Sequence, residues 1–166
     1  MKRKRVRLLI FSFLMTVLMG IVSIQGKQGK AVAYPEGYRS WTHVKSLVLQ
    51  PGHPLFESFG GLHHVYVNAK GLDALKGSRP FPDGSVFAFD LFEVDTGNNA
   101  IAEGKRKVLG VMEKNSKAFA STGGWGFEGF AASTRDRVVK DGGVGCFGCH
   151  AKEAKSTDYV FSRWRD

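Results

Sequence analysis

The sequence predicts a single domain with a mainly β fold of the α+β class, in which a few short helices accompany a sheet. Two observations support this prediction. Apolar residues alternate with a period of two in several segments, and turn-prone residues separate these segments. The chain has 166 residues, of which 43% are hydrophobic. That length is enough for one domain with a hydrophobic core and too short for two large ones.

Residues 1–33 have the pattern of an export signal. A basic start at residues 2–7 precedes an uncharged, apolar run, Leu8–Ile24, and Ala31–Ala33 supplies the small residues that signal peptidase reads. We predict a cut after Ala33 and export to the periplasm, which leaves residues 34–166 as the folded domain. The alternative is an uncleaved membrane anchor, because the uncharged run is close to the minimum length that spans a membrane.

The excess of positive charge belongs to this N-terminal segment. The whole chain has 24 basic and 15 acidic residues, which gives a formal net charge of +9. Seven of the basic residues and none of the acidic ones lie in residues 1–33, so the rest of the chain is nearly neutral. A nucleic-acid-binding domain needs a basic surface of its own, so this distribution argues against a nucleic-acid partner.

The first half of the predicted domain contains an irregular entry or short helix, a strand, a brief helix or loop, and a turn. In that order, they cover residues 34–44, 64–68, 69–76 and 80–84. The strand alternates and ends at the turn-prone Asn68. The turn has the sequence PFPDG, in which proline fixes φ and glycine supplies an unusual φ.

The clearest strand is SVFAFDLFEV, residues 85–94. Alternation places its side chains on two faces, one with Phe87, Phe89 and Leu91, and the other with Val86, Ala88, Asp90 and Phe92. Because both faces are largely apolar, we predict that this strand is central and buried.

The second half of the predicted domain continues with strands and ends in a helix. A polar connection rich in glycine and asparagine, residues 96–100, leads to strands at 107–113 and 123–130. A glycine-rich segment then precedes the C-terminal motif, and we predict that residues 151–156 after the motif are helical.

That motif contains the only two cysteines of the chain, in Cys146-Phe147-Gly148-Cys149-His150. In a Cys-x-x-Cys-His sequence, the two thiols can add to the vinyl groups of a haem, and the histidine can bind the iron through a ring nitrogen. We therefore predict one covalently attached c-type haem. Cys146 and Cys149 attach it, and His150 is its proximal iron ligand.

Two other uses of the cysteines are open at this point. A zinc site needs two further ligands, and the other histidines of the chain are His43, His53, His63 and His64. A redox-active or structural disulfide is the second alternative. A thioredoxin-type pair usually lies early in a βαβ unit, however, and this motif lies near the C-terminus without such a pattern before it.

Several motifs along residues 34–166 resemble those of the cytochrome P-460 superfamily, which includes cytochrome c′-beta. In chain order they are Tyr38-Arg39-x-Trp41, HVYVN at 64–68, FPDGSV at 81–86, VMEK at 111–114, GGWGF at 123–127, Cys146-x-x-Cys149-His150-Ala151 and DYVF at 158–161. The resemblance implies a predominantly antiparallel sheet, one five-coordinate haem in each chain, and a homodimer.

One position separates the branches of this family. In the hydroxylamine-oxidising members, a lysine a few residues after the Pro-Asp-Gly turn is cross-linked to the porphyrin. The corresponding residue here is Phe89, which argues against the cross-link and resembles cytochrome c′-beta, where phenylalanines cap the distal face of the haem. Phe59 is our candidate for a second capping ring. Alternatively, Phe89 is only a core residue of a buried strand.

This resemblance favours a protein that binds nitric oxide and carbon monoxide. An apolar pocket offers no hydrogen bond to bound dioxygen or to an anionic ligand, whereas the two neutral gases need none. A different possibility is an enzyme that oxidises hydroxylamine or nitric oxide and passes electrons to a soluble redox partner. A third is a low-spin electron-transfer cytochrome in which Met112 fills the sixth position of the iron.

An enzyme of this kind would need a distal group that transfers protons. Our candidates for a catalytic residue are Glu113 and His64, and His63 and Asp90 are weaker ones. Adjacent residues of a strand point to opposite faces, so only one of His63 and His64 can reach the iron.

Overall fold

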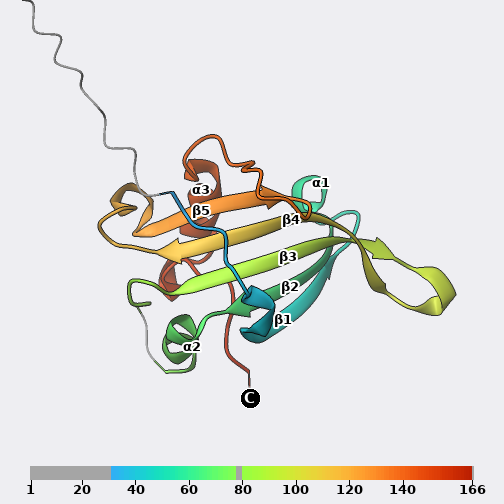
Figure 1. The fold of residues 1–166 in the computed structure, drawn as a ribbon, viewed down its shortest axis with the longest axis horizontal. Coiled ribbons are helices and arrows are strands. Elements are labelled where there is room, and N and C mark those ends of the chain that lie inside the picture. The colour runs from blue at the N-terminus through green and yellow to red at the C-terminus, as the bar shows by residue number, and fades with distance from the viewer. Residues whose placement is uncertain (1–30, 78–79, 166) are drawn as a thin grey trace, which may run out of the picture.

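The computed structural model describes residues 31–77 and 80–165, which form an antiparallel sheet with short helices around it (Figure 1). The sheet has five strands in chain order, and each pairs with its sequence neighbour. They are β1 (Thr42–Leu49), β2 (Gly61–Val67), β3 (Val86–Asp95), β4 (Ala102–Lys114) and β5 (Trp125–Ala131). The mainly β prediction is therefore confirmed, and the strand predicted at residues 85–94 is the central one.

The helices are short. They are α1 (Phe56–Phe59), α2 (Ala69–Lys76) and α3 (Val144–Glu153), with single 3-10 turns η1 (Tyr38–Ser40), η2 (Gly97–Asn99), η3 (Ala120–Thr122) and η4 (Lys155–Thr157). The Asn68 side chain accepts a hydrogen bond from Gly71 N, 2.9 Å away, and caps the start of α2. Among the described residues, no helix is long and apolar enough to span a membrane.

Strand β1 was not among the predicted elements. The irregular entry predicted for residues 34–44 consists of η1 followed directly by this strand. Its pairing with β2 shifts register between His43 and Lys45. Such an irregularity interrupts the period of two by which a strand is recognised, and β1 is also an edge strand with mostly half-buried residues.

Helix α3 begins earlier than predicted. It includes the whole Cys-x-x-Cys-His motif and ends at Glu153. The last part of the helix predicted at residues 151–156 belongs to the 3-10 turn η4. The carboxylate of Asp141 accepts hydrogen bonds from Gly143 N at 2.9 Å and Gly145 N at 2.7 Å. These bonds satisfy backbone donors at the first turn, so the helix can start within a glycine-rich segment that otherwise favours a loop.

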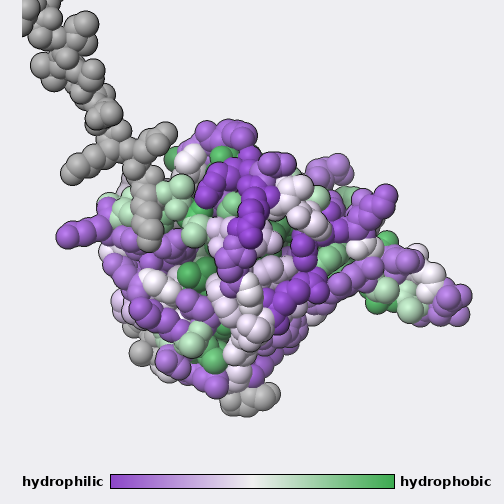
Figure 2. Space-filling view, in the orientation of Figure 1, coloured by the Kyte–Doolittle hydropathy of each residue, from purple (hydrophilic) through white to green (hydrophobic). Residues whose placement is uncertain are grey.

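Each face of the sheet has its own hydrophobic cluster. The N-terminal segment crosses one face, which we call the N-terminal face, and α3 lies behind the sheet (Figure 1). The cluster on the N-terminal face is Val32, Tyr38, Ala88, Leu109, Val111 and Phe130. The surface over it is mainly hydrophilic (Figure 2). The cluster on the other face, the cavity face, includes Val65, Val67, Phe87, Met112, Trp125 and Phe127.

Val32 bears on where the folded domain begins. Its side chain is only 3% exposed and packs in the N-terminal-face cluster. Most of the predicted export signal, residues 1–30, lies outside the described residues, and a cut after Ala33 remains a prediction. A chain that begins at Tyr34 would lack the Val32 side chain, so the position of the cut determines whether this cluster is complete.

Candidate haem site

A cavity of about 570 Å³ lies on the cavity face of the sheet. We call one part of its lining the His150 wall, which comes from α3 and the C-terminal segment: Gly145, Cys146, Cys149, His150, Val160, Phe161 and Ser162. The phenylalanine wall comes from residues 45–63 and from β3: Lys45, Leu47, Leu49, His53, Leu55, Phe59, His63 and Phe89. Val65, Phe87 and Met112 of the sheet form the floor between them.

The His150 imidazole is held in one orientation. Its Nδ1 lies 2.7 Å from the carbonyl oxygen of Tyr159. A carbonyl only accepts hydrogen bonds, so Nδ1 carries the proton and Nε2 keeps a lone pair. Burial lowers the pKa of His150, which favours the neutral ring. The ring also contacts Phe127 and Phe161, with centroid distances of 5.0 and 4.7 Å. A neutral imidazole oriented in this way is suited to bind a metal through Nε2.

The Tyr159 carbonyl is positioned by an unusual backbone conformation. Asp158 and Tyr159 both have left-handed φ values, 50° and 65°. The Asp158 carboxylate accepts hydrogen bonds from Lys114 Nζ at 2.9 and 3.1 Å and from Phe81 N at 2.8 Å. Non-glycine residues rarely adopt this conformation, and it persists where the surroundings fix it. The ion pair with Lys114 therefore helps to hold the carbonyl against His150.

The two cysteines lie three residues apart on α3 and are both free thiols. This spacing places them on one side of a helix. Burial raises the pKa of the Cys146 thiol, whereas a redox-active pair requires a stabilised thiolate. Within residues 31–77 and 80–165, no group of three His, Cys, Asp or Glu side chains could hold a metal ion, so the zinc alternative lacks ligands. Two thiols and a neutral histidine along a mainly apolar cavity fit a haem.

The phenylalanine wall brings together the two predicted capping residues. The rings of Phe59 and Phe89 meet edge to face, with centroids 6.0 Å apart, and both line the cavity. Phe89 pairs with Gly110 of β4, and a methyl group at Gly110 would overlap the Phe89 ring. The glycine therefore makes room for the ring. Phe89 lines the cavity and also packs against the core of this face.

This wall also includes polar side chains, among them His63 and Lys45. His63 is 7% exposed, its ring stacks on Phe89, and its Nε2 lies 2.6 Å from the carbonyl oxygen of Phe59. Burial lowers the pKa of His63 and also that of Lys45, which is half-buried in the same wall. Of the two adjacent histidines, His63 is the one that lines the cavity.

The two candidates for a catalytic residue lie outside the cavity. His64 lies on the N-terminal face of β2, 2.8 Å from Ser46 Oγ and 2.9 Å from Glu103 Oε1. Glu113 pairs with Val86 across β3 and β4, and alternation places it on the N-terminal face as well. Neighbouring residues of a strand, such as His63 and His64, point to opposite faces of the sheet. The sequence does not show which of the two faces borders the cavity.

Asp90 is also on the N-terminal face, where it has a structural role. Its carboxylate is fully buried and accepts hydrogen bonds from Arg106 at 2.6 and 3.1 Å, from Arg39 at 3.1 Å, and from the Tyr38 hydroxyl. Hydrogen bonds from this many donors compensate the free-energy cost of burying the carboxylate. It is therefore not a distal proton donor.

Met112 lies in the floor of the cavity. It pairs with Phe127 of β5, whose ring contacts His150, and it packs in the cavity-face cluster. Met112 is thus buried in the core of this face, beside a ring that contacts His150. This position favours the core-filling role over iron ligation.

The roles of three contributors to the site were not predicted from the sequence. Lys45 belongs to the strand that was not predicted. Tyr159 acts through a backbone carbonyl, which any residue type provides. The hydrogen bond of His63 is also made to a backbone carbonyl, that of Phe59. Contacts of this kind depend on the chain path rather than on a motif.

Comparison with known proteins agrees with this description of the site. The family model for cytochrome P460 matches residues 35–162, a range that contains all five strands and the Cys-x-x-Cys-His motif. No curated protein matches the chain. The family match covers most of the chain, and the sheet and the cavity agree with it. The chain therefore belongs to the cytochrome P460 family of haem-binding cytochromes.

Proposed function

We propose that this chain is an exported mono-haem c-type cytochrome that binds nitric oxide and carbon monoxide, as a member of the family similar to the cytochromes c′-beta. Cys146 and Cys149 would form the two thioether bonds to haem c, and Nε2 of His150 would bind the iron. When bound, the haem supplies an iron centre with one coordination position open to a small gas. The proposal also includes export to the periplasm and assembly as a homodimer.

The contact between Phe59 and Phe89 is the observation that carries this proposal. A phenyl ring cannot bind iron, and two such rings in one wall exclude water from the space that they cover. His63 donates its Nε2 proton to the Phe59 carbonyl, which ties this end of the ring to the backbone beside the cap. A wall of this kind favours small, uncharged ligands that need no hydrogen bond.

The alternative is oxidation of hydroxylamine or nitric oxide, with transfer of electrons to a soluble partner. Two observations weigh against it. Phe89 stands at the position where the cross-linking lysine is expected, and Glu113 and His64 do not line the cavity. A low-spin electron-transfer cytochrome has less support, because Met112 is buried in the cavity-face cluster and a core-filling role explains its position.

Substitution of Phe89 tests the proposal. In ferrous holoprotein, Phe89→Ala should increase the association rate of carbon monoxide and nitric oxide about tenfold, which corresponds to about 1.4 kcal/mol in the barrier. Phe89→Leu, a milder change that better preserves the core, should give a smaller increase. Rapid mixing measures both rates.

Phe92→Ala is the matched control. Phe92 is a buried ring on the same strand, but it lies on the N-terminal face against Arg39 and Arg106. The Phe92→Ala variant should leave the association rates of carbon monoxide and nitric oxide unchanged. Equal rates in wild type and both Phe89 variants would show that Phe89 only fills the core. Turnover of hydroxylamine with an electron acceptor, measured on the same wild-type protein, would replace our proposal with the enzymatic alternative.

A further inference from the structure

Helix α1 carries one of the capping rings but has little to hold it in place. It consists of four residues, none of which is buried, and the residue before it, Leu55, is 41% exposed. A helix of one turn is not stable by itself, so contacts with the rest of the molecule must fix its position. Its last residue is Phe59, so the same contacts fix the cap.

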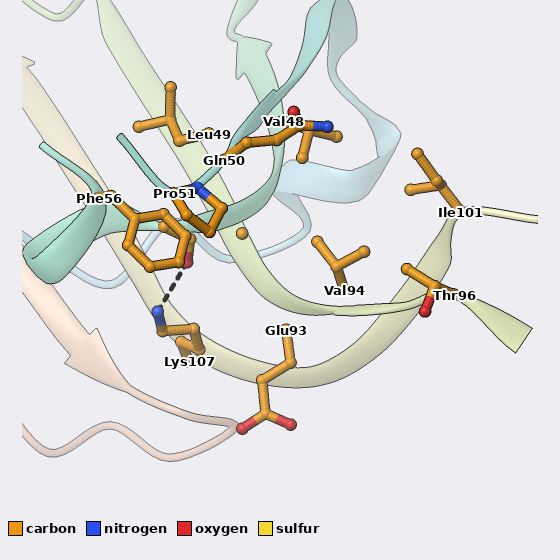
Figure 3. Close-up of a pocket in the computed structure, with 12 residues that line it drawn as sticks. Val48, Leu49, Gln50, Pro51, Phe56, Glu93, Val94, Thr96, Ile101 and Lys107 are labelled. Carbon is orange, nitrogen blue, oxygen red and sulfur yellow. Dashed lines mark hydrogen bonds between the residues drawn. The ribbon is translucent and has the colours of Figure 1, made fainter. Parts of the chain in front are cut away.

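Two side chains of the sheet bind consecutive carbonyl oxygens at the end of α1. His63 of β2 donates from Nε2 to the carbonyl of Phe59 at 2.6 Å, and Lys107 of β4 donates from Nζ to the carbonyl of Gly60 at 2.7 Å. Figure 3 shows the second bond as a dashed line from Lys107. Lys107 lines a separate hollow of about 430 Å³ together with Phe56, whereas His63 lines the haem cavity.

His63 contacts both members of the cap. Its ring stacks on Phe89, with a centroid distance of 5.8 Å and an interplanar angle of 21°, while its Nε2 binds the backbone of Phe59. The imidazole is almost fully buried, so water cannot readily replace this hydrogen bond. One side chain thus joins the short helix to the central strand.

We propose that His63 is a positioning residue that holds Phe59 against Phe89, and that this hydrogen bond limits how fast small ligands enter the haem cavity. The proposal rests on the proposed function, because it assumes that ligands pass the cap. It assigns no iron contact to His63. Loss of the bond releases the end of α1, so the cap opens more often.

Three variants of the holoprotein test this role. His63→Leu removes the donor, and His63→Gln keeps an N–H group that can reach the Phe59 carbonyl. His64→Leu is the control, because the neighbouring histidine lies on the opposite face of the same strand. Two quantities are measured for each variant: amide hydrogen exchange in residues 51–60, and the association rate of carbon monoxide with ferrous protein.

In His63→Leu, we expect amide hydrogen exchange in residues 51–60 and association of carbon monoxide both to become faster by about 2- to 10-fold. This is the range that loss of one hydrogen bond implies. His63→Gln should stay close to wild type in both measurements, and so should His64→Leu. Unchanged exchange and association in His63→Leu would overturn the proposal. Equal effects of Leu and Gln would also overturn it, because they would show that the ring and not the hydrogen bond is responsible.

The two proposals fail in different ways. If wild-type holoprotein does not bind carbon monoxide, the proposed function is wrong. Hydrogen exchange in residues 51–60 still shows in that case whether His63 holds α1. If wild type binds the gas and the variants do not change its association rate, only the role of His63 is contradicted.

Discussion

The two walls of the haem cavity are held in place by different kinds of contact. The His150 wall is tied to the sheet by a buried ion pair between Asp158 and Lys114, next to the carbonyl that orients His150. The phenylalanine wall depends on a four-residue helix without buried side chains, and on single hydrogen bonds to backbone carbonyls. Local stability follows the number of buried contacts, so the second wall should open more readily.

This difference agrees with the proposed function, in which a cofactor is held permanently and a small ligand is exchanged. The iron ligand needs a fixed orientation, which the His150 wall provides through polar contacts that resist displacement. Ligand entry needs a part of the cavity that can move at small cost, which the phenylalanine wall provides. Variants in the His150 wall should therefore affect global stability, and variants in the phenylalanine wall should mainly affect ligand access.

The largest effect is expected from the ion pair behind the His150 wall. Asp158→Ala leaves the buried Lys114 amine without its carboxylate, and it removes the acceptor for Phe81 N. Breaking a buried pair by removing one partner costs about 3–5 kcal/mol. We expect a loss of this size in the free energy of unfolding, measured by chemical denaturation of the holoprotein.

The exposed pair Lys152–Glu153 on α3 provides the control for this variant. Its nitrogen–oxygen distance is 3.1 Å, similar to that of the buried pair, but its side chains are 82% and 51% exposed. Glu153→Ala should change stability by less than about 1 kcal/mol. If Asp158→Ala and Glu153→Ala had equal effects, the ion pair would not be what fixes the His150 wall.

A smaller effect is expected in the phenylalanine wall. Gly110→Ala adds a methyl group where the Phe89 ring lies, so the ring must move into the cavity. Overpacking of this kind costs about 1–3 kcal/mol. The displaced ring narrows the cavity, and carbon monoxide should associate more slowly.

Gly97→Ala, in the connection between β3 and β4, is the control because a methyl group there makes only ordinary contacts. It should leave the association rate unchanged. If Gly110→Ala destabilised the protein without altering ligand association, the Phe89 ring would not border the path of the ligand.

The features that could be predicted from the sequence are those with a regular pattern. The central strand follows from a run of residues that is apolar on both faces, whereas residues 69–76, for which a brief helix or loop was predicted, form α2. The haem motif is recognisable from its spacing alone. In contrast, β1 has a register shift that hides its period, and the glycines near Cys146 conceal the start of α3.

The walls of the cavity were predictable to different degrees. Phe59 and Phe89 follow from the family resemblance, and the structure places them in contact. The choice between His63 and His64 depends on the orientation of the sheet, which a single strand does not determine. The contact between His150 and the Tyr159 carbonyl requires two left-handed residues, and these are stabilised by Lys114 from a distant strand. These residues lie in two of the quoted motifs, VMEK and DYVF, but neither motif shows that the two segments meet.

The absorption spectrum of the purified ferrous protein, recorded with and without carbon monoxide, tests whether the phenylalanine wall leaves the iron open. We predict a high-spin spectrum that shifts when the gas is added, because neither Phe59 nor Phe89 can bind iron. A low-spin spectrum that carbon monoxide does not alter would mean that a protein side chain fills the sixth position. That result would contradict the gas-binding proposal and favour electron transfer.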